Sequence, residues 1–249
     1  MMARRMRRGH PLPKVLLWTF LLLLVYSSSL SFMRAGMREQ TPRERVAIAA
    51  PDISVFVPEN AVLNKQMSVD LENDGVDEIV LAYAIPDESN RYSIATRVRI
   101  LKYRSRSGWS VAFEDLGTVD NGGGPSDAIT IEKVTSSSGK DGVVVALRNS
   151  GAGTAIEWHL LAAARNRIIK LNAMRVKAKV LKDRGYWDGG YNGVSTDGDL
   201  VIESLPGYST HTARCCPDRP PLEIRLRFTG TSLTLDSVKE VLPFTPQKY

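Results

Sequence analysis

The stretch Leu222-Glu-Ile-Arg-Leu-Arg-Phe228 carries the pattern that decides the fold of this chain. Its apolar side chains alternate with charged ones, and this period of two places one side of a strand on a core and the other side in water. The stretch Thr96-Arg-Val-Arg-Ile-Leu-Lys-Tyr103 begins with the same alternation. Both stretches therefore predict half-buried strands of a sheet.

Short β-type runs of this kind recur from Ile53 to the end of the chain, separated by clusters of turn residues. The other runs that we predict as strands are 78–84, 109–113, 128–131, 142–147, 175–181, 200–205 and 232–235. The segment 156–164 is rich in alanine and leucine and also fits a helix, but we predict a strand that runs into a turn. The sequence thus predicts an all-β domain built as an antiparallel meander.

Three of the predicted strands follow a turn that contains Asp or Gly, and Val80, Val144 and Val201 mark their positions. The spacings between these valines are 64 and 57 residues, which is close to the length of one β-propeller blade. Three such units are fewer than a closed propeller normally has. We therefore expect a partial or irregular β-propeller-like domain, or an open meander or sandwich.

The N-terminal segment is a membrane-targeting element. Residues 1–14 hold five basic side chains and no acidic one, and an apolar run follows directly. Basic residues stay in the cytoplasm while an adjoining apolar run enters the bilayer. The strongly apolar core, 15–26, suits a signal peptide, with Ser29-Leu-Ser31 as a cleavage pattern. The uncharged span reaches 19 residues over 15–33, which is long enough for a transmembrane helix. The segment is therefore either an uncleaved anchor or a cleaved signal peptide.

This assignment divides the chain into four parts. They are a basic cytoplasmic region 1–14, a transmembrane or signal segment 15–33, a polar linker or stalk 34–50, and a β-rich extracytoplasmic domain 51–249. A domain of that length buries a substantial core. We expect a single-pass membrane protein with an extracytoplasmic C-terminal domain, or a secreted or periplasmic protein if the segment is cleaved.

The excess of basic residues is explained by the N-terminus. The whole chain has 33 basic and 27 acidic residues, and residues 15–249 retain 28 basic and 27 acidic ones. A nearly neutral domain lacks the concentrated positive field that phosphate binding requires. We therefore predict contact with a membrane through 15–33 and no nucleic-acid partner.

The most informative candidate site is the acidic turn Val69-Asp-Leu-Glu-Asn-Asp-Gly-Val-Asp-Glu-Ile-Val80. Acidic oxygens recur at alternate positions before a glycine, which is the arrangement that a hard cation such as Ca²⁺ needs. The alternative is that the acids only cap a solvated turn, because Asp-Gly and Asn-Asp are common turn formers. The predicted ligands are Asp70, Glu72, Asp74, the carbonyl of Val76 and Glu78.

This turn resembles the Asp-x-Asp/Asn-x-Asp-Gly-x-x-Asp/Glu loop of FG-GAP and VCBS-type repeats. The resemblance covers about 15 residues, and residues 64–113 as one blade-like unit. It implies a calcium-binding loop that leads into a strand of a propeller blade. Glu72 departs from the usual Asp or Asn, and the corresponding turns at 136–142 and 194–199 do not keep the acids. The expected role of calcium is therefore structural and confined to one turn.

Cys215 and Cys216 are the only cysteines, and they are adjacent. In an oxidising compartment they form a strained vicinal disulfide, remain thiols or bridge to another chain. A strained vicinal bond is easily reduced, which would make the pair a redox switch. The alternative is a rigid loop that the neighbouring prolines reinforce.

The stretch Gly185-Tyr-Trp-Asp-Gly-Gly-Tyr-Asn-Gly193 is predicted to be a long aromatic loop. Tyr186, Trp187 and Tyr191 are candidates for contact with a protein or glycan ligand, since such rings bury a large area and keep a polar handle. The alternative is that the rings fold back over an edge of the core.

The catalytic candidates are weak. The two histidines after the membrane segment, His159 and His211, have no nucleophile-elbow, zincin or triad-like context. We therefore predict a non-enzymatic binding or structural module. The alternative is an extracytoplasmic enzyme or redox-responsive factor that uses Cys215 and Cys216.

Overall fold

A computed structural model describes residues 48–87, 89–90, 93–120, 124–150, 154–189, 192–209 and 216–244. The predicted membrane segment 15–33 and the basic region 1–14 lie outside these residues. Within the described ranges, no helix is both long enough and apolar enough to cross a membrane.

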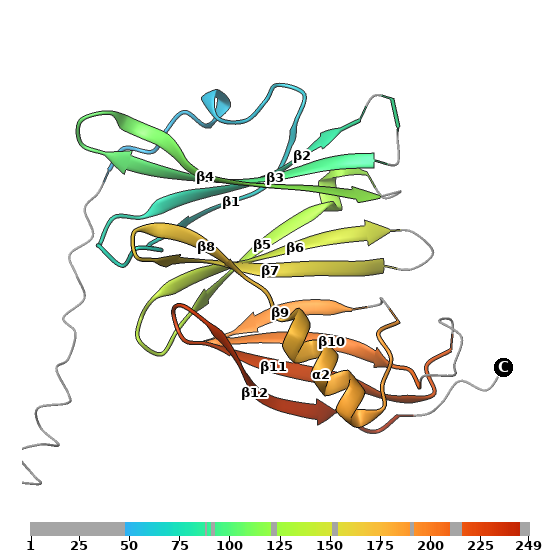
Figure 1. The fold of residues 1–249 in the computed structure, drawn as a ribbon. Coiled ribbons are helices and arrows are strands. Elements are labelled where there is room, and N and C mark those ends of the chain that lie inside the picture. The colour runs from blue at the N-terminus through green and yellow to red at the C-terminus, as the bar shows by residue number, and fades with distance from the viewer. Residues whose placement is uncertain are drawn as a thin grey trace, which may run out of the picture. The chain divides into compact units, whose positions relative to one another are not determined.

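The described residues form three four-stranded antiparallel sheets, and within each sheet consecutive strands are neighbours (Figure 1). The first sheet consists of β1 (Val62–Val69), β2 (Glu78–Pro86), β3 (Ser93–Arg104) and β4 (Gly108–Asp120). The second consists of β5 (Ile129–Thr135), β6 (Asp141–Ser150), β7 (Thr154–Ala164) and β8 (Arg167–Leu171). The third consists of β9 (Gly193–Asp197), β10 (Leu200–Gly207), β11 (Arg219–Phe228) and β12 (Leu233–Glu240). The predicted all-β class and the antiparallel pairing are confirmed, and none of the sheets is closed.

Two short 3-10 helices and one α-helix complete the described fold. The 3-10 helices are η1 (Ile53–Val55), before the first sheet, and η2 (Pro125–Asp127), before the second. The α-helix α2 (Met174–Arg184) connects the second sheet to the third. The segment 156–164, for which strand and helix were both considered, lies in the strand β7.

The three marker valines occupy equivalent places in the three sheets. Val80 lies on β2, Val144 on β6 and Val201 on β10, and each of these is the second strand of its sheet. A turn that contains Asp or Gly precedes each of them. The 64- and 57-residue spacings are therefore the spacing of one structural unit, a four-stranded meander.

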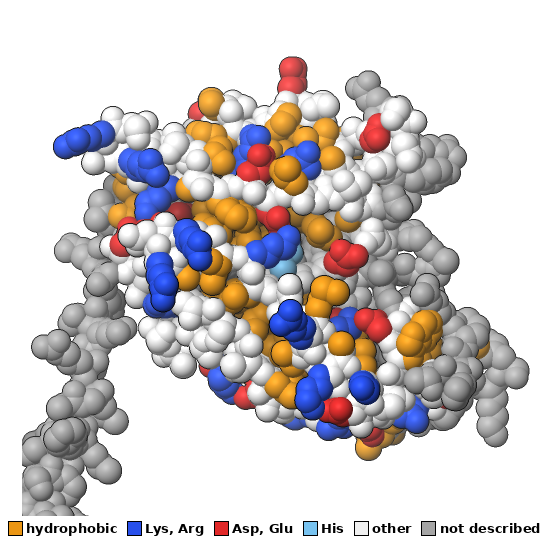
Figure 2. All heavy atoms as spheres, in the orientation of Figure 1, with side chains coloured by type: hydrophobic (Ala, Val, Ile, Leu, Met, Phe, Trp, Pro, Cys, Tyr) orange, Lys and Arg blue, Asp and Glu red, His pale blue; other side chains and the backbone are white. Residues whose placement is uncertain are grey.

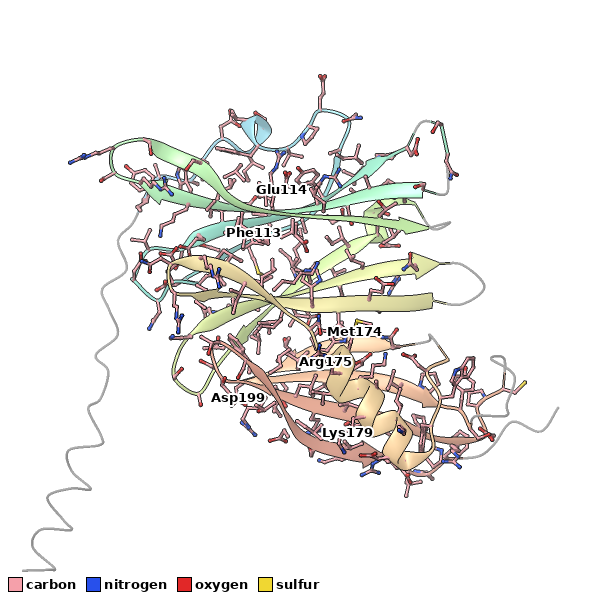
Figure 3. The ribbon with its side chains drawn as sticks, in the orientation of Figure 1. Phe113, Glu114, Met174, Arg175, Lys179 and Asp199 are labelled. Carbon is pink, nitrogen blue, oxygen red and sulfur yellow. The ribbon has the colours of Figure 1, made fainter. Side chains whose placement is uncertain are left out.

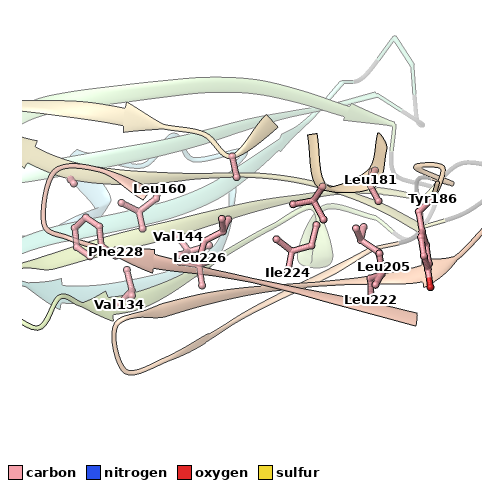
Figure 4. Packing of buried hydrophobic residues seen from close by; sticks show 14 residues of the cluster. Val134, Val144, Leu160, Leu181, Tyr186, Leu205, Leu222, Ile224, Leu226 and Phe228 are labelled. Atoms are coloured by element: carbon pink, nitrogen blue, oxygen red, sulfur yellow. The ribbon is translucent and has the colours of Figure 1, made fainter. Parts of the chain in front are cut away.

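The second sheet is buried on both faces. Val143 and Val145 of β6 belong to a core cluster shared with the first sheet, whereas Val144 belongs to a cluster shared with the third. In the latter cluster, Val144 and Leu160 pack with residues such as Phe228 (Figure 4). Because both faces of this sheet are apolar, β6 has a continuous run of hydrophobic residues and no alternation.

The two outer sheets end the stack differently. Ile79, Leu81 and Tyr83 of β2 point away from the second sheet and pack against Ile53 and Phe56 of the segment before β1. The third sheet instead has one polar face, because the charged positions of the alternating strand β11 lie opposite its buried apolar ones. One outer face is thus covered by the chain itself and the other is hydrophilic.

The strand predicted over 175–181 is wrong, because these residues lie in α2. The spacing of Val176 and Val180 fits a strand's period of two, but it also places both on one face of a helix. Val180 and Leu181 are buried in the core between the second and third sheets, with Val176 packed against it. Gly185 ends the helix in the left-handed conformation, at φ 68°.

Candidate functional site

The acidic turn connects β1 to β2 and is organised around Asp70. The two carboxylate oxygens of Asp70 accept hydrogen bonds from the backbone N–H groups of Asp74, at 3.0 Å, and Gly75, at 2.9 Å. Asp74 in turn accepts a bond from the N–H of Val76 at 2.9 Å. Gly75 has φ 87°, which an L side chain rarely adopts. The turn therefore needs both its acids and its glycine for its shape.

Glu78 begins β2 and is only 3 % exposed. Its Oε2 atom accepts a hydrogen bond from the N–H of Leu71 at 2.9 Å, whereas Oε1 has no hydrogen-bond partner in the described part of the chain. Burial raises the pKa of Glu78 to about 7, with the bond from Leu71 opposing the rise and the charges of Glu72 and Asp74 adding to it. A buried carboxylate oxygen without a partner calls for a proton or a cation.

The predicted ligand set is only partly assembled. Glu72 forms an ion pair with Lys102 of β3, so its carboxylate already has a cationic partner. No group of three His, Cys, Asp or Glu side chains among the described residues converges as a metal site would require. Asp70, Asp74 and Glu78 still share one short turn, so calcium binding there stays a prediction.

In the corresponding turns of the other two sheets, the acidic side chain has a cationic partner. In the second sheet, Asp141 accepts a hydrogen bond from Thr135 at 2.7 Å and lies 3.4 Å from the ammonium of Lys133. In the third sheet, Asp199, labelled in Figure 3, forms an ion pair with Arg227. Glu78 is therefore the acid at this position that lacks a direct cationic partner among the described residues.

A pocket of about 510 Å³ adjoins the acidic turn, and its volume lies in the range of small-ligand sites. Trp109 fixes one wall, since its indole N–H donates to the carbonyl of Ala49 at 2.8 Å and its ring meets that of Tyr103 edge-on at 5.7 Å. The lining residues are Ile48, Ala49, Asp74, Val76, Lys102, Tyr103 and Ser105. Because Asp74 and Val76 belong to both features, the turn forms part of the pocket wall.

Tyr186 of the predicted ligand loop is built into the core. It is 5 % exposed, and its hydroxyl donates to the carbonyl of Pro220 and to Glu240, both at 3.2 Å. The guanidinium of Arg219 lies 5.1 Å from the centre of its ring. Burial, aided by Glu240, raises the pKa of the Tyr186 hydroxyl. This ring serves packing, as in the alternative in which the aromatic residues cover an edge of the core.

Trp187 also folds back on the domain. Its backbone N–H donates to the carbonyl of Tyr208 at 2.9 Å, and the two rings meet edge-on at 6.2 Å. A Cβ atom at Gly189 would lie 2.3 Å from the Tyr208 ring, so the loop packs too closely for any side chain there. Tyr191 lies outside the described residues.

The redox hypothesis falls partly on residues that the structure does not describe. Cys216 is half-buried, and Cys215 and His211 lie outside the described ranges. The vicinal disulfide thus stays a prediction.

Sequence reasoning missed a polar contact between the first two sheets. Asp115 of β4 lies 2.6 Å from Nε2 of His159 on β7, and both of its oxygens lie 3.1 Å from the ammonium of Lys170 on β8. Burial alone would raise the pKa of Asp115, but the neighbouring His159 and Lys170 outweigh it and lower the pKa. No local pattern marks these residues, because they meet only through sheet packing.

A second charged network joins α2 to the third sheet. Glu203 of β10 is 1 % exposed and accepts hydrogen bonds from Lys177 at 2.7 Å and Asn192 at 2.9 Å. Lys177 also pairs with Asp188 at 2.9 Å, and these two acids raise its pKa although burial opposes this. Asn192 bonds both backbone groups of Ile156, each at 2.7 Å. The network holds the loop before β9 against the second sheet.

The acidic turn with its adjoining pocket is thus the part of the described structure best suited to binding. Its chemistry is that of carboxylate and carbonyl oxygens beside an aromatic ring, and the two buried networks serve the packing of the sheets. A scan against protein-family models, a search of curated proteins and a search of solved structures found no match to this chain.

Proposed function

We propose that the domain is a non-enzymatic binding module of an exported or membrane-anchored protein, and that calcium stabilises its 70–78 turn. The observation that carries this proposal is the buried Glu78, whose Oε1 atom lacks a hydrogen-bond partner among the described residues. A divalent cation would satisfy this oxygen and offset the repulsion among the acids of the turn.

Calcium at this turn would also have a role in ligand binding. Asp74 and Val76 supply turn oxygens and also line the pocket. Fixing the turn would therefore fix one wall of the pocket. Tyr103 offers an aromatic face beside the polar groups of Lys102 and Ser105, which suits a glycan ring or a polar peptide segment.

We also infer that the three sheets are blade-like units of an open, propeller-like stack. Each is a four-stranded meander in sequence order, and the marker valines occupy the same strand in each. The acidic turn precedes the second strand of the first unit, which agrees with the resemblance to FG-GAP and VCBS-type loops. The segment before β1 and the polar face of the third sheet take the places at which further blades would pack.

Thermal unfolding with Ca²⁺ and with a chelator tests the calcium site. Binding at about 100 times Kd stabilises a protein by about 2.7 kcal/mol, which is roughly 5–10 °C in Tm for a domain of this size. We expect Glu78→Gln to raise Tm in chelator, because it removes a buried carboxylate, and to abolish the response to Ca²⁺. Asp197→Asn, at an exposed acid of the corresponding third turn, is the matched control and should keep the response. If Ca²⁺ does not change the Tm of the wild-type protein, the calcium site is refuted.

A further inference from the structure

The charge of the domain is unevenly distributed. Residues 165–184 contain eight basic residues and one acidic residue, whereas the rest of 15–249 contains 20 basic and 26 acidic ones. The nearly even balance of the whole domain hides this asymmetry. A segment of 20 residues thus carries a positive charge of seven on a domain that is otherwise acidic.

This basic segment is continuous in space as well as in sequence. It comprises the turn after β7, the edge strand β8 and the helix α2. Figure 2 shows blue side chains distributed over the face on which these elements lie, with hydrophobic ones between them. We call the exposed basic residues of these elements the basic surface; they are Arg165, Arg167, Lys170, Arg175, Lys179, Lys182 and Arg184.

The helical part of the basic surface faces outward for a simple geometric reason. Arg175, Lys179 and Lys182 are spaced four and three residues apart and so lie on one side of α2. Val180 and Leu181, on the other side, are buried in the core. Figure 3 shows Arg175 and Lys179 along this helix. The core contact therefore fixes the direction in which the positive charges point.

Few acids neutralise this surface. Lys170 is paired with Asp115, and Lys179 with Asp183. In the described ranges, no ion pair is found for Arg165, Arg167, Arg175, Lys182 or Arg184. Most of the positive charge is thus available to an external anion.

We propose that the basic surface docks the domain on an anionic lipid bilayer. Two arguments favour lipid over a soluble polyanion. Met174, at the first position of α2, is 74 % exposed beside Arg175, and an apolar side chain among basic ones suits the headgroup boundary of a membrane. The predicted membrane segment 15–33 also keeps the domain within reach of a bilayer through the short linker 34–50, which raises the effective concentration of the surface. This second argument rests on the membrane attachment proposed above.

Hydrogen–deuterium exchange of the full chain reconstituted in vesicles tests the proposal. We expect the backbone amides of 165–184 to exchange at least several-fold more slowly on vesicles with phosphatidylglycerol than on pure phosphatidylcholine, and high salt to remove the difference. Arg175→Glu with Lys182→Glu should abolish the protection, since neither residue has an ion partner to lose among the described residues. Lys65→Glu with Arg106→Glu, at exposed positions outside the basic surface, makes the same change of charge and should retain it.

Each outcome separates the two proposals. A chain that fails to float with pure phosphatidylcholine vesicles contradicts attachment through 15–33, and its binding to phosphatidylglycerol vesicles still reports on the basic surface. Equal exchange on both lipids, or protection that survives the double reversal, overturns the docking proposal alone. Protection by a DNA duplex and not by phosphatidylglycerol would overturn it in favour of a nucleic-acid partner. Circular dichroism of both double variants checks that the fold is intact.

Discussion

The carboxylate of Asp115 on β4 lies 2.6 Å from the imidazole Nε2 of His159 on β7, so a buried polar contact joins the first and second sheets. The surrounding interface is made of aliphatic side chains such as Val98 and Leu161. Apolar packing is not directional, whereas a polar contact depends on the alignment of the two strands. The pair thus adds a directional contact between two sheets that are not hydrogen-bonded to each other.

Replacing Asp115 with Asn should destabilise the protein by roughly 1–3 kcal/mol at neutral pH, because the buried imidazole of His159 loses its charged partner, whereas the exposed Lys170 loses little. Asp236→Asn is the matched control, since Asp236 pairs with Arg227 on the surface and its loss should cost clearly less. Urea unfolding of both variants measures the difference. Equal losses in the two variants would show that burial adds nothing to the first pair.

The carboxylate of Asp115 should also make the free energy of unfolding depend on pH in the acidic range. The pKa of Asp115 is lowered in the folded protein from its ordinary 3.8, so its contribution is present above that pH and is lost as the pH falls through the folded value. We expect the unfolding free energy of the wild type to decline below about pH 4 more steeply than that of Asp115→Asn. Denaturant titrations at a series of acidic pH values test this, and parallel curves would argue against it.

Glu78 should produce the opposite dependence near neutrality. Its pKa is raised from 4.5 to about 7, so the folded state binds a proton that the unfolded state has lost, and stability falls as the pH rises from 4.5 to 7. In chelator, we expect a loss of up to roughly 3 kcal/mol over this interval. Glu78→Gln should flatten the curve, and saturating Ca²⁺ should restore the stability of the wild type at pH 7. A slope that Glu78→Gln leaves unchanged would assign the dependence to another group.

Lys177→Met should be severely destabilising, by about 3–5 kcal/mol, because it leaves the buried Glu203 without its cation. The double variant Lys177→Met with Glu203→Gln should recover much of this loss, since no buried charge remains. A double-mutant cycle measured by urea unfolding gives the coupling. Lys179→Met is the control on the exposed side of the same helix and should cost about 0.5 kcal/mol or less. Additive effects of the two core changes would contradict a coupled pair.

Phe228 and Gly142 should behave as a packed pair across the second and third sheets. Phe228 is fully buried, and a Cβ atom at Gly142 would lie 3.0 Å from its ring. We expect Phe228→Ala to cost about 3–5 kcal/mol and Gly142→Ala to cost about 1–3 kcal/mol through overpacking. Phe228→Leu should relieve part of the effect of Gly142→Ala in thermal unfolding. Strict additivity would show that the ring and the glycine are not in contact.

The partly polar edge strands β1, β8 and β9 were not predicted from the sequence. β1 is largely exposed and has no alternation of apolar side chains, yet it pairs with β2 from Val62 opposite Ala84 to Val69 opposite Glu78. Edge strands depend on the hydrogen bonds of a neighbour more than on their own composition. Such strands can be recognised only from their pairing in the folded sheet.

The sequence by itself determined the all-β class, the repeat of the marker valines and the position of the acidic turn, because the period of the side chains and the chemistry of turns are local properties. Tertiary structure decided the rest. The core between the second and third sheets made 175–181 a helix, since Val176, Val180 and Leu181 bury one face there. Packing also brought Asp115 to His159 and Glu203 to Lys177 from separate elements, and it left the other basic residues of 165–184 exposed. These contacts depend on long-range burial, and a short stretch of sequence does not determine which distant side chains it will contact.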